Sequence, residues 1–141
     1  MSGALSDLYR AVILDHSRRP RNYRRVDDGA VVAEGDNPLC GDTLTVYVAL
    51  QDGVLRDTAF QGVGCVLSTA SASMMTEVVQ GRSPAEVAEL CAAFGALVTA
   101  GRAGALPQGL SAFAGVGAFP SRVQCALLPW RALSRALHLP E

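Results

Sequence analysis

Hydrophobic and polar residues alternate along this chain with two spacings, which predict where helices and strands lie. Near the N-terminus, apolar residues recur at helical spacing, and we expect this helix to stop before Pro20. The stripe consists of Leu5, Leu8, Tyr9, Val12, Ile13 and His16. We interpret His16 as a packing residue of this stripe, not as a ligand.

The pattern then changes to that of strands. Residues 43–50 alternate and are rich in β-forming types, residues 51–53 have the chemistry of a hairpin turn, and residues 54–61 return as a partner strand. Residues 30–33 are a further, short strand candidate. We therefore expect an antiparallel hairpin in the first half of the chain.

Helical patterns fill most of the second half. Residues 66–80 predict a helix that Gly81 can end, and the small side chains from Ser68 to Ser73 favour close packing on a sheet. Ser83 and Glu86 form a capping box that opens the next helix. Its apolar face consists of Val87, Leu90, Cys91, Phe94, Leu97 and Val98, so Cys91 is expected to be a buried core thiol.

The remaining segment and the last helix contain most of the helix-breaking residues. Residues 101–117 are rich in Gly and Ala and predict a surface excursion, with a short helix around residues 110–113. Pro120 and Ser121 can open the last helix, and Pro129 inside it predicts a kink.

Composition narrows the class of protein. A chain of 141 residues, half of them hydrophobic, suits a single domain over residues 1–141 with its own core. The net charge of −1 favours neither nucleic acid nor an anionic membrane as a partner. No secretory signal or membrane span is apparent, so we expect a cytoplasmic protein whose four cysteines are reduced thiols or metal ligands.

The chemistry gathers around Cys40 and Asp42. These residues lie two apart at the start of the predicted hairpin, so their side chains can point to the same side. Cys65 follows two glycines just past the partner strand, and the hairpin brings it close to them. With Cys125 of the last helix, three thiols and one carboxylate supply the four ligands of a tetrahedral zinc site. A carboxylate among thiolates indicates a more exchangeable site than a structural one.

Arginines suggest contacts with a partner. Arg122 precedes Cys125 by three residues and shares its helix face, where it can stabilise thiolates, dock a partner or simply lie at the surface. The cluster between Arg18 and Arg25 is interpreted as a solvated loop or a partner-docking patch.

At these residues the chain resembles the SufU/IscU (NifU N-terminal) family of iron–sulfur cluster assembly proteins. The resemblance is carried by residues 37–42, 62–65, 68–74 and 122–125, together with residues 8–16 and 20–22. It is closer to the SufU branch, because Gln124 occupies the position of a histidine in the IscU branch and residues 118–122 lack the Leu-Pro-Pro-Val-Lys chaperone-binding motif. Residues 101–117 also look like the insertion typical of SufU.

The resemblance implies an α+β fold, with a small three-stranded antiparallel sheet and helices packed on one face. It implies a zinc-bound sulfur acceptor or sulfurtransferase that works with a SufS-type cysteine desulfurase and hands sulfur on to downstream Suf scaffold proteins. By analogy Cys40 is the acceptor thiol, and Asp42, Cys65 and Cys125 hold zinc.

Two other functions stay open from the sequence. One is a scaffold that builds an iron–sulfur cluster on Cys40, Cys65 and Cys125. The other is a zinc-stabilised module that binds proteins.

Overall fold

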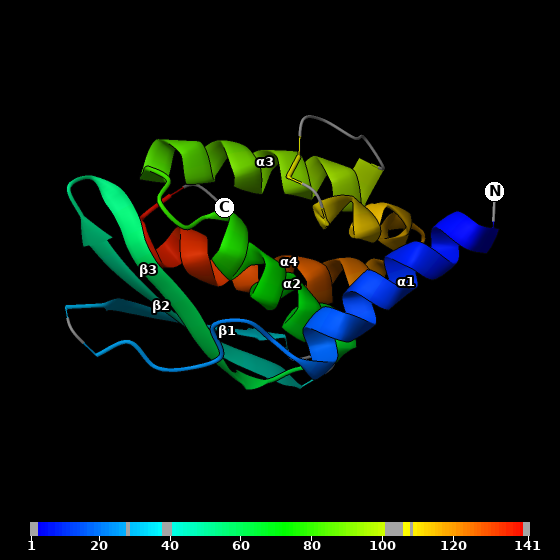
Figure 1. The fold of residues 1–141 in the computed structure, drawn as a ribbon, viewed down its shortest axis with the longest axis horizontal. Helices are drawn as coiled ribbons and strands as arrows, with labels where there is room; N and C mark the ends of the chain where they lie inside the picture. The colour runs from blue at the N-terminus through cyan, green and yellow to red at the C-terminus, as the bar shows by residue number, and fades with distance from the viewer. Residues whose placement is uncertain (1–2, 28, 38–40, 101–105, 108, 140–141) are drawn as a thin grey trace.

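A computed structural model describes residues 3–27, 29–37, 41–100, 106–107 and 109–139 (Figure 1). Its elements, in chain order, are α1 (Gly3–Arg18), β1 (Val31–Asn37), β2 (Asp42–Gln51), β3 (Val54–Val63), α2 (Val66–Val78), α3 (Pro84–Ala100), the 3₁₀ helix η1 (Leu110–Ala118) and α4 (Pro120–Ala136). None of the helices described is both long enough and apolar enough to cross a membrane.

The three strands form one antiparallel sheet in the order β1-β2-β3. Asp52 and Gly53, at the turn between β2 and β3, both have positive φ, the conformation that a tight hairpin turn requires. The predicted hairpin is therefore confirmed. The first strand is longer than predicted and continues to Asn37, with exposed Glu34 and Asp36 alternating with buried Gly35 and Asn37.

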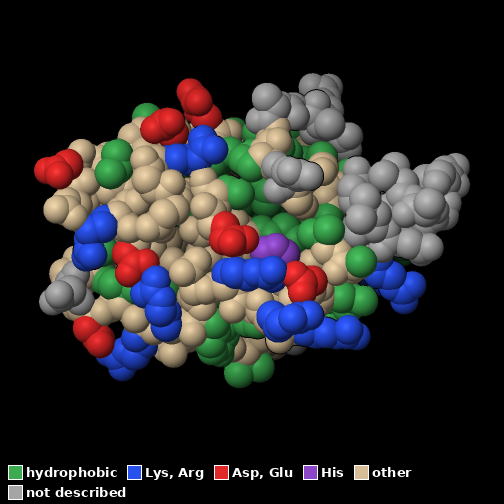
Figure 2. Space-filling model, in the orientation of Figure 1, with side chains coloured by type: hydrophobic (Ala, Val, Ile, Leu, Met, Phe, Trp, Pro, Cys, Tyr) green, Lys and Arg blue, Asp and Glu red, His purple; other side chains and the backbone are tan. Residues whose placement is uncertain are grey.

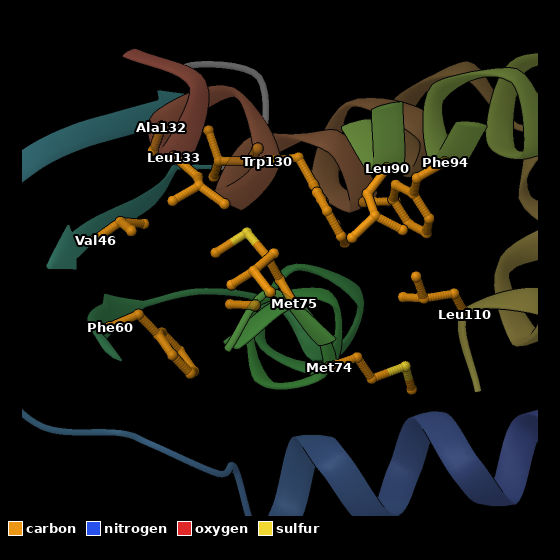
Figure 3. Packing of buried hydrophobic residues seen from close by; sticks show 14 of the residues in the cluster. Val46, Phe60, Met74, Met75, Leu90, Phe94, Leu110, Trp130, Ala132 and Leu133 are labelled. Carbon is orange, nitrogen blue, oxygen red and sulfur yellow. The ribbon is translucent and has the colours of Figure 1, made fainter. Parts of the chain in front are cut away.

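Helices cover one face of the sheet, as the resemblance implied. Helix α4 packs on β1 and β2, and α2 packs on β3. Helix α1 lies against α2, whereas α3 packs on α4 and η1 (Figure 1). In Figure 3, Met75 of α2 points toward Leu133 and Trp130 of α4, so the core lies between α2, α4 and the sheet.

Small residues in α2 permit the close approach of α2 and α4. The Ser71 hydroxyl, fully buried, donates to the carbonyl of Ala126 over 2.6 Å and accepts from Trp130 Nε1 over 3.1 Å. Trp130 in turn stacks on Phe94 of α3, with ring centroids 5.0 Å apart. The small residues of α2 were predicted to favour close packing on a sheet; at Ser71 the close contact is with helix α4 instead.

Serine and histidine side chains attach α1 to α2. His16 Nδ1 lies 2.7 Å from Ser73 Oγ, which also accepts the backbone N–H of Arg21 over 2.9 Å. Burial lowers the pKa of His16 below its ordinary value, and the nearby Arg21 acts in the same direction. The interpretation of His16 as a packing residue is confirmed.

The arginines between residues 18 and 25 are largely paired within the chain. Arg21 pairs with Asp15 over 2.8 Å, and Arg24 pairs with Asp57 over 2.6 Å. Figure 2 shows arginine side chains interleaved with acidic ones on the face that carries α1. The proposed docking role of this cluster stays a prediction.

The short helix predicted around residues 110–113 is found, but residues 110–117 do not form the predicted surface excursion. They belong to η1, where Leu110 and Phe113 are fully buried and Val116 nearly so. The spacing of three residues matches the turn of a 3₁₀ helix, so these side chains form one apolar face. The Phe113 ring packs edge-on against Phe94, with centroids 5.5 Å apart, so η1 is part of the core. Residues 101–105 and 108 lie outside the described part of the chain.

The expected helix starts are found. Glu86 Oε1 accepts the Ser83 backbone N–H over 3.0 Å, and Ser83 Oγ accepts the Glu86 N–H over 3.2 Å, so the capping box is confirmed. Helix α4 begins at Pro120 as predicted. Pro129 is buried within α4, and the kink at that residue stays a prediction.

Candidate metal centre

Three of the four predicted ligand residues meet at one end of the sheet. One ligand atom from each of Asp42, Cys65 and Cys125 lies within 4.8 Å of the others. Asp42 and Cys125 are buried, and Cys65 is half-buried. Cys40, the fourth predicted ligand, lies outside the described residues, two positions before Asp42.

Strand register brings Asp42 and Cys65 together. Asp42 is the first residue of β2 and pairs with Asn37, the last residue of β1, while its neighbour Thr43 pairs with Val63 of β3. Cys65 follows Val63 by two residues, so it reaches the same end of the sheet.

A glycine makes this approach possible. Gly62 has a φ of 143°, and a side chain there would collide with the carbonyl oxygen of Thr43. Gly62 therefore permits the close approach of β3 to β2 just before Cys65.

Both oxygens of Asp42 accept hydrogen bonds. The backbone N–H of Cys65 donates to Oδ1 over 3.1 Å, and the hydroxyl of Ser68 donates to Oδ2 over 2.9 Å. The carboxylate is thus oriented by α2 as well as by its own strand. The sequence predicts only a packing role for Ser68, so its contact with Asp42 is an addition from the structure.

Cys65 is the N-cap residue of α2. Its Sγ accepts the backbone N–H of Ser68 over 3.5 Å, as a serine or aspartate side chain does at other helix starts. The positive end of a helix dipole favours negative charge, so this position suits a thiolate. The predicted location of Cys65 at a helix start is confirmed.

Cys125 is supplied by α4. Its Sγ lies 4.0 Å from Asn37 Nδ2, a weak contact to the last residue of β1. Asn37 is buried and is a second site residue that sequence analysis did not single out. The signal for it was its place in the Asn-Pro-Leu-Cys-Gly-Asp run, which was interpreted through Cys40 and Asp42 only.

Arg122 lies at the rim of the site. It lines an open hollow of about 450 Å³ together with Cys65 and Cys125, so the predicted shared face of Arg122 and Cys125 is confirmed. Its guanidinium carbon lies 4.3 Å from the centroid of the Phe119 ring, a cation–π contact. Val66 and Phe119, both nearly half exposed, add apolar surface beside it.

Cys91 lies away from these residues. It lines a separate hollow of about 420 Å³ between α3 and α4, and its Sγ is 3.5 Å from Ser134 Oγ. Cys91 packs against the core as predicted, but the hollow beside it leaves the side chain half-buried instead of fully buried. Burial raises the pKa of the Cys91 thiol, which keeps it protonated and unreactive.

The donor set fits a soft metal ion. Two thiol sulfurs and one carboxylate oxygen converge in a mostly buried position, with hydrogen-bond donors already holding the carboxylate. Thiolates suit zinc and iron–sulfur clusters, whereas magnesium and calcium prefer oxygen ligands only.

Comparison with known proteins gives a consistent picture. Residues 8–105 match the family described as the NifU-like N terminal domain. The chain is 39% identical to the iron–sulfur cluster assembly scaffold protein IscU of Streptococcus pyogenes serotype M1, over 94% of this chain and 84% of the relative. It is 35% identical to the zinc-dependent sulfurtransferase SufU of Bacillus subtilis, over 97% of this chain and 94% of the relative.

Solved structures agree in fold. A structure from Fervidobacterium islandicum AW-1, described as a candidate iron–sulfur cluster assembly scaffold protein for the SUF system, superposes with a TM-score of 0.84 at 30% identity. The superposed region covers 89% of this chain and 93% of the chain in that structure.

Proposed function

This chain belongs to the NifU-like N-terminal domain family, that of the SufU and IscU proteins of iron–sulfur cluster assembly, and we propose that within it the chain is a zinc-dependent sulfur acceptor. The convergence of Asp42, Cys65 and Cys125 within 4.8 Å carries the proposal. Gln124, at the position where IscU scaffolds are expected to have histidine, favours the SufU-type activity over the scaffold one.

In this proposal Cys40, Asp42, Cys65 and Cys125 hold the zinc ion. When bound, zinc keeps coordinating thiols deprotonated at neutral pH. Cys65 and Cys125 are fixed by α2 and α4, and Asp42 is fixed by Cys65 and Ser68. Cys40, two positions before Asp42 in the sequence, is the thiol assigned to react with the sulfur donor.

The sulfur donor is a persulfide on a SufS-type cysteine desulfurase. The Cys40 thiolate attacks the terminal sulfur of that persulfide, as in thiol–disulfide exchange. The sulfur–sulfur bond of the donor breaks, a new one forms on Cys40, and the donor cysteine leaves as a thiolate. The reaction therefore needs no further oxidant or reductant, and the sulfur then passes to downstream Suf scaffold proteins.

Arg122 is assigned to contact with the partner. It is exposed, lies beside the thiols and is supported by the Phe119 ring. A guanidinium in this position can pair with a carboxylate of the desulfurase or with the anionic end of its persulfide.

A second candidate function is cluster assembly on the thiolates of Cys40, Cys65 and Cys125. The 39% identity to a protein named as an IscU scaffold favours it. Anaerobic purification, metal analysis and a visible spectrum separate the two functions, because a cluster absorbs visible light and zinc does not.

The Cys40→Ser variant tests the acceptor assignment. We expect it to abolish stimulation of a SufS-type desulfurase, measured as cysteine-dependent sulfide release, while a folded chain still holds zinc weakly through the other ligands. Arg122→Ala should lower stimulation without loss of zinc. Stimulation by Cys40→Ser at the level of the parent would show that Cys40 is not the acceptor.

A further inference from the structure

Ser68 connects two of the candidate ligands. Its hydroxyl lies 2.9 Å from Asp42 Oδ2 and 3.6 Å from Cys65 Sγ, and its backbone N–H lies 3.5 Å from the same sulfur. A hydroxyl has one proton to donate, and the shortest of these contacts directs it to the carboxylate. Cys65 returns a hydrogen bond from its backbone N–H to the other carboxylate oxygen, so Asp42, Cys65 and Ser68 form a closed ring of contacts.

The chain makes room for this hydroxyl. Ser68 is fully buried, and a side chain on Gly64 would collide with its Oγ. Ser68 is also the third residue after the N-cap of α2, so the start of that helix fixes the position of its backbone. This buried hydroxyl, 2.9 Å from the carboxylate of a candidate ligand, therefore contributes a hydrogen bond to the site as well as packing.

From this geometry we infer that Ser68 is the positioning residue of the metal centre: it holds Asp42 in the orientation in which the carboxylate and Cys65 share one ion. Each carboxylate oxygen keeps a second lone pair for a metal while it accepts a hydrogen bond. Hydrogen-bond partners of metal ligands typically change affinity by about 10- to 100-fold when they are removed.

The inference rests on the proposed function, because it takes Asp42, Cys65 and Cys125 as zinc ligands. It adds a reason why zinc stays bound when Cys40 carries sulfur. If Cys40 reacts, the other ligands must hold the ion. Ser68 contacts two of these ligands, Asp42 and Cys65. Loss of its hydroxyl should therefore weaken zinc binding before it affects the fold.

Ser71 supplies a matched control on the same helix. Like Ser68 it is fully buried and its hydroxyl is hydrogen-bonded, but its partners are Ala126 and Trp130, away from the site. Ser68→Ala and Ser71→Ala thus remove the same atom from two buried positions of α2. Only the first removes a contact to a candidate ligand.

The experiment measures zinc affinity by competition with a chromophoric chelator, and the spectrum of the Co²⁺-substituted protein. We expect Ser68→Ala to bind zinc about 10- to 100-fold more weakly and to alter the thiolate-to-cobalt bands, with recovery in Ser68→Thr, which keeps a hydroxyl. Ser71→Ala should lose thermal stability and keep the parental affinity and spectrum.

Parental affinity in Ser68→Ala, or an equal loss in Ser71→Ala, would overturn the inference, as would Ser68→Thr binding as weakly as Ser68→Ala. If Ser68→Ala does not fold, Gly64→Ala takes its place, because it displaces the hydroxyl without removing it. Unchanged zinc binding in that variant would also overturn the inference. A parent chain that binds no zinc would instead refute the proposed function.

Discussion

At the scale of single residues, the chemical environments of Cys65 and Cys91 differ because they lie in different elements of the fold. Cys65 caps α2 and contacts the hydrogen-bonding groups of Ser68, which suits a metal-binding thiolate. Cys91 contacts a hydroxyl at the edge of a hollow, and burial raises the pKa of its thiol. The two thiols therefore have different chemistry.

A substitution at Cys91 should separate packing from chemistry. We expect Cys91→Ala to destabilise the fold by about 1 kcal/mol, since it removes one half-buried sulfur next to the core. Zinc content and sulfur acceptance should match those of the parent. Thermal unfolding and metal analysis check this, and loss of zinc from the variant would mean that Cys91 is a ligand.

The sequence predicted Asp42, Cys65 and Cys125 as a group, and the structure brings them together. It did not reveal Ser68 or Asn37 as part of the site. Serine is common where helices pack closely, so the sequence alone gave no reason to assign Ser68 to the site. Its position three residues after Cys65 indicates a contact only when Cys65 is known to be the N-cap of α2. A contact across 26 residues, such as that of Ser68 with Asp42, depends on the packing of α2 on the sheet.

At the scale of elements, α1 depends on α2 for its attachment. The neutral form of His16 is favoured in the fold by burial and by Arg21, although Glu77 and Asp15 oppose this. The folded-state pKa is thus below the ordinary value of 6.5. As pH falls through 6.5, the unfolded chain takes up a proton that the folded chain resists, so stability is lost.

We expect the thermal midpoint of the parent to fall more between pH 7.5 and pH 5.5 than that of His16→Gln, as linkage at a histidine with an ordinary pKa of about 6.5 requires. Glutamine can still hydrogen-bond to Ser73 but does not titrate. Zinc loss at acidic pH affects both proteins, so the difference between them isolates His16. Equal changes in the two midpoints would contradict the assignment.

The 3₁₀ helix is the element that sequence analysis placed wrongly. A short helix was expected around residues 110–113, but within a surface excursion, whereas Leu110, Phe113 and Val116 form one buried face against α3 and α4. Glycine serves the packing here, since a side chain on Gly117 would approach the carbonyl oxygen of Val98 to 2.8 Å. The composition of this segment did not predict its burial, because three apolar residues spaced three apart are enough to form a buried face of η1.

Phe113→Ala tests whether η1 belongs to the core. The ring is fully buried against Phe94, so its removal should destabilise the fold by about 3–5 kcal/mol. Ser111→Ala, at a partly exposed position of the same helix, is the control and should change stability little. A surface excursion would give small effects for both variants in chemical denaturation.

At the scale of the whole molecule, the candidate metal centre lies where the separate parts of the fold meet. Asp42 belongs to the sheet, Cys65 to α2 and Cys125 to α4. The hairpin could be predicted from its turn and strand pattern, so the approach of Asp42 and Cys65 was expected from the sequence. Cys125 was expected as the fourth ligand from its residue type and from the family resemblance, but not from geometry, because its position depends on how α4 packs on β1 and β2.

Because one metal ion would join all three parts, metal binding and folding should be linked. An ion that binds only the folded chain stabilises it by about 4 kcal/mol when its free concentration is 1,000 times the dissociation constant. For a chain of this size we therefore expect removal of zinc by a chelator to lower the thermal midpoint by about 10 °C. Returning zinc in excess should restore the midpoint.

Cys125→Ser supplies the control, because it removes the ligand that connects α4 to the sheet end. We expect its midpoint to be low and to respond weakly to chelator or added zinc, whereas Cys91→Ala should respond as the parent does. Calorimetry of the three proteins with and without chelator gives the comparison. If the thermal midpoint of the parent does not change on chelation, the packing of α2 and α4 on the sheet sets the stability by itself. The side chains of Asp42, Cys65 and Cys125 would then lie close together without a bound ion that links the sheet, α2 and α4.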